Sequence, residues 1–210
     1  NDSGIPRKVI IELLKSKKLQ NAAPLDKAKA IFDFVRKSMT WNDESSAGTW
    51  SDNSETWKLR SGNSAAINLL LLRTLVQEGI TAYPMLVGLR KSGYVHKDYP
   101  VWGNFRSVVV VIEQIGKEKI LLDASDKFTP FSIPPYDVLN NYGYILRGPK
   151  DASWHYAVGQ ASNDETAYIK AKLDSAGLLR GEIKTRYNNY AQATYREMKA
   201  DGPNYKIFNA

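Results

Sequence analysis

The stretch RSGNSAAINLLLL, residues 60–72, decides the fold. A glycine followed by small polar residues at the start of a long apolar helix is how several enzymes present a nucleophile. The backbone N–H groups and the positive end of the helix dipole favour a negative charge that develops there. Ser64 stands in the nucleophile position. In the plainer interpretation Ser64 is the N-cap of the helix and accepts a hydrogen bond from a backbone N–H.

Outward from this stretch, apolar periodicity and turn residues predict an alternation of helices and strands. Helices are expected over residues 6–19, 25–38 and 64–78, with Gly79 as the C-terminal stop of the third. Strands are expected over 81–89, 107–113 and 119–123, the last two joined by a turn at 114–117. A polar loop is expected from 42 to 55 and a proline-punctuated segment from 129 to 144.

The character of the sequence changes near residue 151. Two further strands are predicted over 167–173 and 178–187, followed by a polar helix over 188–200. The expected organisation is therefore an α+β core over residues 1–150 and a small C-terminal β-hairpin and helix extension over 151–210. That extension is interpreted as the start of a following β domain or as a linker.

Composition excludes several chemistries. The 210 residues contain no cysteine and two histidines, His96 and His155. Disulfides, thiol catalysis, cysteine-ligated metals and a histidine-rich metal site are thereby excluded, and neither a metal nor a cofactor is expected. No apolar run approaches the roughly 18 residues of a membrane span, so no transmembrane segment is expected.

The formal net charge is +7, and much of the basic excess lies in the first 37 residues. These residues form either a solvated helix face or a surface that attracts an acidic polymer. Nucleic acid is not an expected partner, because the basic residues are not interleaved with aromatic ones and no recognised nucleic-acid-binding motif is present.

Several short motifs occur in an order that resembles the transglutaminase-like family, which has the papain-like cysteine-protease fold. They are Gly62-Asn63-Ser64 before the leucine-rich helix, GITAYPMLV (79–87), NFRSVVV (104–110), ILLDA (120–124) and PPYDVLNNYG (134–143). The last is similar to a segment of large, exported bacterial members. The resemblance covers about residues 20–147. It implies N-terminal helices and a central helix packed on an antiparallel sheet, and an extracytoplasmic location.

The departures from the family pattern concern its catalytic triad. Ser64 stands where the family has its nucleophilic cysteine, Ser107 stands at the histidine position, and Asp123 remains as the aspartate. A positioned general base contributes on the order of 100- to 10,000-fold to the rate, and serine without one is a weak nucleophile. The resemblance therefore implies a catalytically inactive binding or scaffolding module of a larger exported protein.

Three alternatives remain open at the level of sequence. Ser64 could act as the nucleophile of an acyl transferase or an amide or ester hydrolase, with Asp123 and an unrecognised base. Asp123 could instead fix a turn or pair with a basic residue, and Arg106 and Ser107 could be ordinary strand residues. The N-terminal helices could bind an acidic polymer, with strongly salt-dependent affinity.

Aromatic residues gather in the loops expected around the inferred cleft. The candidate ligand-binding residues are Trp50, Trp57, Tyr94, Tyr99, Trp102 and Arg106. Aromatic faces suit sugars and peptides, and the alternative is that they pack at the rim of the core. A peptide, a glycan or a neighbouring domain is the expected partner, and the sequence leaves the oligomeric state open.

Overall fold

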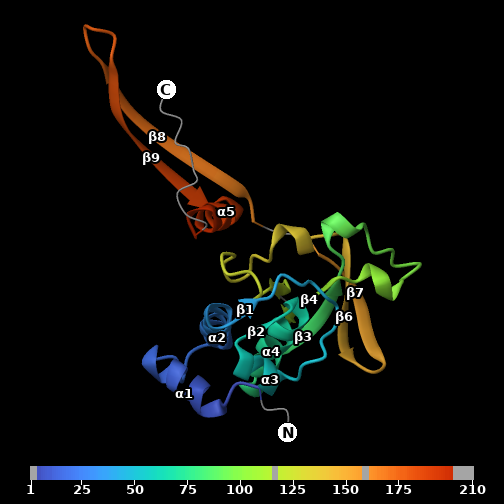
Figure 1. Cartoon of the computed structure of the whole chain (residues 1–210). Helices are drawn as coiled ribbons and strands as arrows, with labels where there is room; N and C mark the ends of the chain where they lie inside the picture. Colours follow the sequence, from blue (N-terminus) through green and yellow to red (C-terminus); the bar gives the residue numbers. More distant parts are fainter. Residues whose placement is uncertain (1–3, 115–117, 158–160, 201–210) are drawn as a thin grey trace. The chain divides into compact units, whose positions relative to one another are not determined.

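The computed structural model describes residues 4–114, 118–157 and 161–200. The chain divides into two compact units, residues 1–159 and 160–210. Figure 1 shows the first unit as helices packed on an antiparallel sheet, and the second as a long hairpin with one helix. The fold class is α+β, as the sequence predicts.

Within its described residues, the first unit contains four α-helices. They are α1 (Arg7–Ser16), α2 (Pro24–Ser38), α3 (Asn53–Leu59) and α4 (Ser64–Gln77). Helix α2 begins with Pro24, whose fixed φ suits the first helical turn. It buries Ala28, Ile31, Phe32 and Val35, the spacing of an apolar stripe on a helix. Helix α4 is apolar on almost every side, which fits its position in the middle of the unit.

The main sheet has five antiparallel strands in the order β5-β4-β3-β6-β7. Their bounds are β3 (Ala82–Val87), β4 (Ser107–Ile112), β5 (Ile120–Leu122), β6 (Tyr142–Gly148) and β7 (Asp151–Tyr156). Short 3-10 turns lie at Arg90–Ser92, Trp102–Asn104 and Tyr136–Val138. A separate parallel pair joins β1 (Thr40–Trp41) to β2 (Ser61–Gly62), directly before α4.

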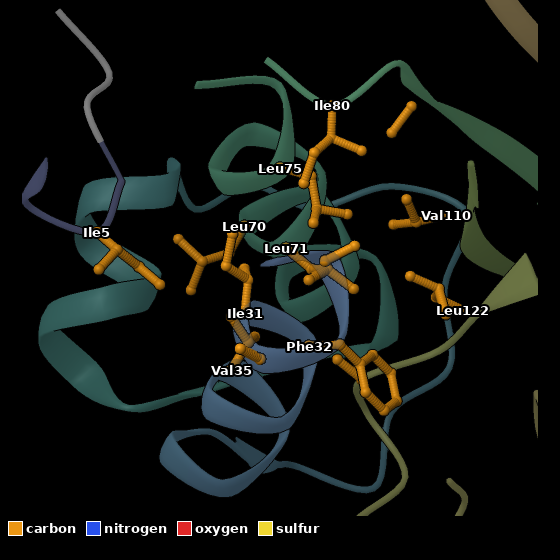
Figure 2. Packing of buried hydrophobic residues seen from close by; sticks show 14 of the residues in the cluster. Ile5, Ile31, Phe32, Val35, Leu70, Leu71, Leu75, Ile80, Val110 and Leu122 are labelled. Atoms are coloured by element: carbon orange, nitrogen blue, oxygen red, sulfur yellow. The ribbon is translucent and has the colours of Figure 1, made fainter. Parts of the chain in front are cut away.

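The main hydrophobic core lies between α2, α4 and the sheet (Figure 2). Leu70, Leu71 and Leu75 of α4 are fully buried there. They pack with Ile31, Phe32 and Val35 of α2 and with Val110 and Leu122 of the sheet. Burial of side chains of this size stabilises a fold by about 1.5–3 kcal/mol each relative to exposure. The core therefore fixes α4, and Ser64 at its start, against strand β4.

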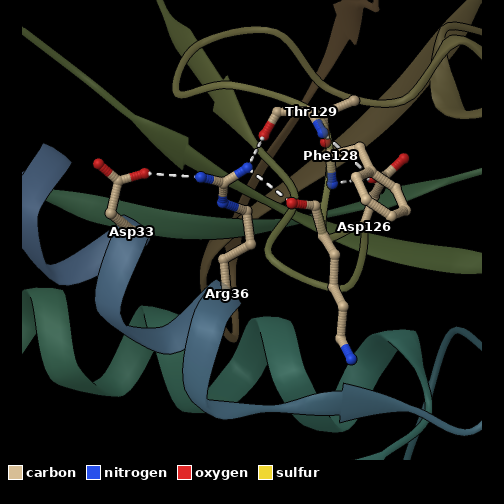
Figure 3. Close-up of polar contacts among 6 residues, drawn as sticks. Asp33, Arg36, Asp126, Phe128 and Thr129 are labelled. Carbon is tan, nitrogen blue, oxygen red and sulfur yellow. Dashed lines mark hydrogen bonds and ion pairs between the residues drawn. The ribbon is translucent and has the colours of Figure 1, made fainter. Parts of the chain in front are cut away.

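Arg36 of α2 holds the loop that follows β5 (Figure 3). One guanidinium nitrogen donates 2.8 Å hydrogen bonds to the carbonyl oxygens of Lys127 and Thr129, and another pairs with Asp33 at 3.1 Å. Arg36 is one of the N-terminal basic residues for which the sequence analysis predicts either a solvated helix face or a surface that attracts an acidic polymer. Its burial shows that it is a structural residue of the core.

The second unit consists of β8 (Asn163–Leu173), β9 (Leu179–Asn188) and α5 (Asn189–Ala200). The two strands pair antiparallel without a break from Asp164↔Asn188 to Leu173↔Leu179. Helix α5 packs against the open end of the hairpin, where Tyr187 stacks on Tyr195 with ring centroids 4.5 Å apart. The predicted hairpin and the helix after it are therefore present. Strand β8 begins before the predicted residue 167, and β9 ends just after the predicted residue 187.

Besides the short strands β1 and β2, the structure contains three elements that the sequence prediction lacks. Helix α3 forms inside the expected loop and its continuation, because Asp52 caps it through a 2.7 Å hydrogen bond from the Glu55 N–H. Strand β6 begins inside the proline-punctuated segment. Strand β7 lies beyond residue 150 yet pairs with β6, so the first unit extends to residue 159. The predicted turn at 114–117 falls mostly outside the described residues.

Candidate functional site

Ser64 begins α4, but it is not the cap of that helix. Asn63 is the N-cap, and its side-chain oxygen accepts a 2.9 Å hydrogen bond from the Ala66 N–H. The plainer prediction for Ser64 is therefore wrong by one residue. Gly62 precedes them because a Cβ there would lie 2.9 Å from the Ala66 Cβ, so the close approach of β2 to the helix requires glycine.

The N–H and the hydroxyl of Ser64 are both hydrogen-bonded within the chain. Its N–H donates to the Glu44 carbonyl at 3.1 Å, and its Oγ accepts from the Ser46 N–H at 3.1 Å. The same hydroxyl lies 3.4 Å from the Ser46 carbonyl, to which it donates. Because the N–H and the hydroxyl of Ser64 already have partners in the chain, neither group is free to bind a substrate.

The structure brings the two serines at the expected nucleophile and histidine positions into contact. The Ser107 hydroxyl, at the start of β4, donates a 3.0 Å hydrogen bond to Ser64 Oγ. The exposed fractions are 2% for Ser64 and 1% for Ser107. A hydroxyl is not a base at neutral pH, so this contact cannot activate Ser64 in the way that an imidazole activates a catalytic serine or cysteine.

Asp123, the third expected triad residue, lies directly after β5 and is buried. Its Oδ1 accepts hydrogen bonds from the Asn68 amide at 2.8 Å and from the Ser125 N–H and Oγ at 2.9 and 2.6 Å. Burial raises the pKa of Asp123, and the hydrogen bonds from Ser125 and Asn68 oppose that rise. The carboxyl group fixes a turn and the helix, which agrees with the structural alternative in the sequence analysis.

Asn68 is the residue of this site that sequence reasoning missed. It lies one helical turn after Ser64 and is fully buried. Its amide nitrogen donates to Asp123 and to the Val108 carbonyl at 2.9 Å, and its oxygen accepts from the Ala124 N–H at 2.8 Å. The available signal was a single polar residue within the apolar run 65–72, four positions after a candidate nucleophile.

Neither histidine lies in contact with Ser64. His96 is exposed in the loop between β3 and β4. His155 lies on β7 opposite Gly143, three strands from β4 in the order of the sheet. Burial lowers the pKa of His155, with a further lowering from nearby Lys119.

A second hydrophobic cluster packs over the first turn of α4. It contains Ala65, Leu86, Val95, Phe105 and Val108. Four aromatic rings run across it in series: Trp102 to Phe105 and Phe105 to Trp154 at 6.4 Å, and Trp154 to Tyr144 at 4.7 Å between centroids. This aromatic cover packs on Ala65, the neighbour of Ser64, while Ser46 and Ser107 contact the Ser64 hydroxyl itself.

The candidate ligand-binding residues lie in different environments. Tyr94, Tyr99 and Trp102 are 64%, 80% and 66% exposed in the loop between β3 and β4. Arg106 is exposed next to β4. Trp50 is fully exposed in the loop before α3.

Trp57 differs from the other five. It lies on α3 and packs against Phe34 at 5.9 Å between ring centroids, while the Arg60 guanidinium carbon lies 3.1 Å from its ring centre. Trp57 is therefore engaged in packing within the first unit.

The loop that carries Tyr94, Tyr99 and Trp102 is tied to the segment before β6. Arg90 donates a 3.0 Å hydrogen bond to the Leu139 carbonyl, and the Asn140 amide donates to the Gly93 carbonyl at 2.6 Å. Val95 and Asn141 form an isolated parallel bridge. The first part of the loop, which carries Tyr94, is therefore fixed to the segment before β6.

A shallow cavity of about 380 Å³ lies elsewhere, along the solvent side of α4. It is lined by Thr49, Ser51, Asp52, Asn53, Leu69, Leu72, Arg73 and Val76. It does not include Ser64, Ser107 or Asp123.

Among the described residues, no three His, Asp or Glu side chains are grouped so that they could hold a metal ion. None of the helices in the described ranges combines the length and apolarity that crossing a bilayer requires.

Comparison with known proteins assigns no family to the chain. No family model and no curated protein matches the chain. One solved structure is similar, the crystal structure of a "putative protease" from Parabacteroides distasonis, at 16% identity and a TM-score of 0.40. The match covers 57% of this chain and 23% of that one. The chain therefore spans less than a quarter of that protein, and a likeness of this size assigns no activity.

Proposed function

We propose that the first unit is a transglutaminase-like domain that has lost its catalytic triad and that serves as a binding or scaffolding module of a larger exported protein. The observation that carries the proposal is the 3.0 Å hydrogen bond between Ser107 and Ser64. It supports the alignment of these residues with the base and nucleophile of the family, because those two groups must also touch.

The same observation supports the loss of activity. Ser64 is buried, its hydroxyl and N–H are hydrogen-bonded within the chain, and its nearest side-chain partner is a hydroxyl in place of an imidazole. The Asp123 oxygen that would orient an imidazole already accepts three hydrogen bonds. The hydrolase or acyl-transferase alternative needs a base at Ser64, and both histidines lie elsewhere.

The binding role is supported by the exposed aromatic residues of the loop between β3 and β4. The loop is tied to the segment before β6 at Gly93 and Val95, next to Tyr94, and Trp102 packs on Phe105. Exposed aromatic side chains such as these suit peptides or sugars. The extracytoplasmic location belongs to this proposal as well, since it follows from the resemblance alone.

The first experiment is intact-mass analysis after incubation with a fluorophosphonate probe, on the wild-type chain and on Ser64→Ala. We expect no adduct on either protein. An adduct on the wild type that is absent from Ser64→Ala would overturn the inactive assignment.

A second experiment tests the alignment of the two positions. The double variant Ser64→Cys/Ser107→His places a thiol beside an imidazole, which should lower the thiol pKa relative to Ser64→Cys alone. The thiolate absorbance near 240 nm, followed against pH, reports that difference. Equal pKa values in two folded variants would contradict the correspondence of these residues with the triad.

A further inference from the structure

The hairpin of the second unit separates apolar from basic side chains. Side chains alternate along a strand, so the two residues of each cross-strand pair lie on the same face. The apolar face carries the pairs Ile169 and Ile183, Ala171 and Gly181, and Leu173 and Leu179. The opposite face carries all of the basic side chains of the two strands, which are Lys170, Lys172, Arg180, Lys184 and Arg186.

The apolar face is open to solvent over its outer part, which consists of Ile169, Leu173, Leu179 and Ile183. Their exposed fractions are 69%, 70%, 66% and 66%. Helix α5 lies at the inner end of the hairpin, where the same face ends in the pair Glu165 and Tyr187, and Tyr187 stacks on Tyr195 (Figure 1). A two-stranded hairpin is marginally stable in water unless its apolar face packs on something. The outer part of the face therefore needs a cover.

The opposite face has an excess of positive charge. Besides the five basic side chains it carries two acidic ones, Asp164 and Glu182, so its net charge is +3. Glu182 pairs with Lys184 at 3.2 Å. Among the described residues, the other four basic side chains form no ion pair, and all four are exposed. This face therefore attracts a negatively charged surface.

We infer that the apolar face of the hairpin inserts into the surface of a membrane that contains anionic lipids. Amphipathic helices that bind at a membrane interface combine an apolar face with a polar face rich in Lys and Arg, and this hairpin has the same division of side chains. With the aliphatic side chains at the acyl boundary, the backbone lies among the lipid headgroups. The basic groups of the opposite face are then within a Debye length, about 8–10 Å, of the lipid phosphates.

Two features favour a lipid surface over a protein surface as the cover. Protein interfaces are anchored mainly by Trp, Tyr and Arg, whereas the outer part of the apolar face is aliphatic throughout. The small pair Ala171 and Gly181 also leaves the centre of the face low, between the isoleucines and the leucines. Fluid acyl chains fill such a hollow, whereas a protein would need a matching ridge. The inference concerns the second unit and is independent of the proposed function of the first.

Flotation of the full chain with lipid vesicles tests the inference. One set of vesicles is phosphatidylcholine alone, and the other is an equal mixture of phosphatidylcholine and phosphatidylglycerol. We expect the chain to bind the anionic vesicles at least about tenfold more tightly than the neutral ones, and less tightly as the salt concentration rises. A chain that binds neither set would overturn the inference and leave a protein surface as the cover. Equal binding to both sets would contradict the preference for anionic lipids.

Variants separate the apolar face from the other basic surfaces of the chain. Ile169→Thr/Ile183→Thr keeps β-branched residues in both strands and should weaken binding to the anionic vesicles at least about tenfold, because two inserted apolar side chains are lost. The matched control Tyr168→Thr shortens a neighbouring side chain on the opposite face that is 66% exposed, and it should leave the affinity unchanged. Equal affinities of the double variant and the wild type would assign the binding to the basic N-terminal helices and overturn the inference.

The absence of native cysteine permits a direct test of insertion. Ile169→Cys and Tyr168→Cys place a single thiol on the apolar face and on the opposite face, and each thiol is labelled with the fluorophore NBD. With the anionic vesicles, we expect a blue shift of the NBD emission, and quenching by a spin label on the acyl chains, at position 169 only. Equal responses at the two positions, or no response at position 169, would contradict insertion through the apolar face.

Discussion

The Asn68 side chain of α4 donates a 2.8 Å hydrogen bond to Asp123, 55 residues away at the end of β5. Through the same amide it also bonds to the Val108 carbonyl and the Ala124 N–H. One side chain thus joins the central helix to two strands of the sheet. Polar groups in an apolar interior are stable only when they are paired in this way.

Replacement of Asn68 by leucine should destabilise the first unit by at least about 2 kcal/mol. The leucine removes the hydrogen bonds of Asn68 to the Val108 carbonyl and the Ala124 N–H and one of the three to Asp123, and each buried group left unsatisfied costs about 1–3 kcal/mol. Chemical denaturation followed by tryptophan fluorescence measures the loss. The control Asn21→Leu lies at an exposed position and should cost little. A loss below about 1 kcal/mol for Asn68→Leu would contradict the role of the amide.

Asp123 should give the stability of the wild type a pH dependence that Asp123→Asn lacks. Burial raises the folded pKa above the unfolded value of about 3.9. The native state therefore binds the proton more tightly, and stability falls as the pH rises from the unfolded pKa through the folded pKa. We expect the difference in unfolding free energy, wild type minus variant, to grow as the pH falls through this window. A difference that is constant between pH 4 and 8 would show that the folded pKa is not raised.

The buried position of Ser64 should make a thiol there unreactive. In Ser64→Cys, burial raises the thiol pKa and excludes the reagent. We expect modification by an aromatic disulfide reagent on the order of 100-fold slower than for Tyr99→Cys, because reaction at position 64 needs local opening. Position 99 is the control, since Tyr99 is 80% exposed. Similar rates at the two positions would mean that the aromatic cover is open in solution.

Removal of a ring from the aromatic cover should both destabilise the unit and open the site. Phe105→Ala is expected to cost about 3–5 kcal/mol, the usual range for a buried phenylalanine. Combined with Ser64→Cys, it should raise the rate of thiol modification at position 64. An unchanged rate in a folded double variant would show that Phe105 does not close the site.

Arg36→Lys should destabilise the loop after β5, although it conserves the charge. The guanidinium contacts two carbonyls and Asp33 at once, whereas an ammonium cannot reproduce that fork. We expect a loss of about 1–3 kcal/mol in unfolding free energy. The control is Lys37→Arg at the neighbouring exposed position. A change within about 0.5 kcal/mol at position 36 would contradict the structural role of Arg36.

Apolar periodicity in the sequence predicted the helices and strands whose own buried face holds them in the fold. Helices α1, α2 and α4 and strands β3, β4 and β5 lie within a few residues of their predicted bounds, because apolar periodicity selects the period of the element. Helix α3 was missed because its short polar sequence resembles a loop. The helix forms because the Asp52 side chain caps its first turn. Strands β6 and β7 were missed because the pairing of β6 with β3 and of β7 with β6, and not their own pattern, holds them in the sheet.

Sequence by itself determined the fold class, the exclusion of cysteine chemistry and the presence of serine at the two positions aligned with the family's cysteine and histidine. Each of these follows from residue identity or local spacing. Only the tertiary structure decided that Ser64 and Ser107 touch, that Asn68 engages Asp123, and that aromatic rings cover the start of α4. The hydrogen bonds among these contacts join residues 43 to 56 positions apart, and all of the contacts depend on how the helix and sheet pack.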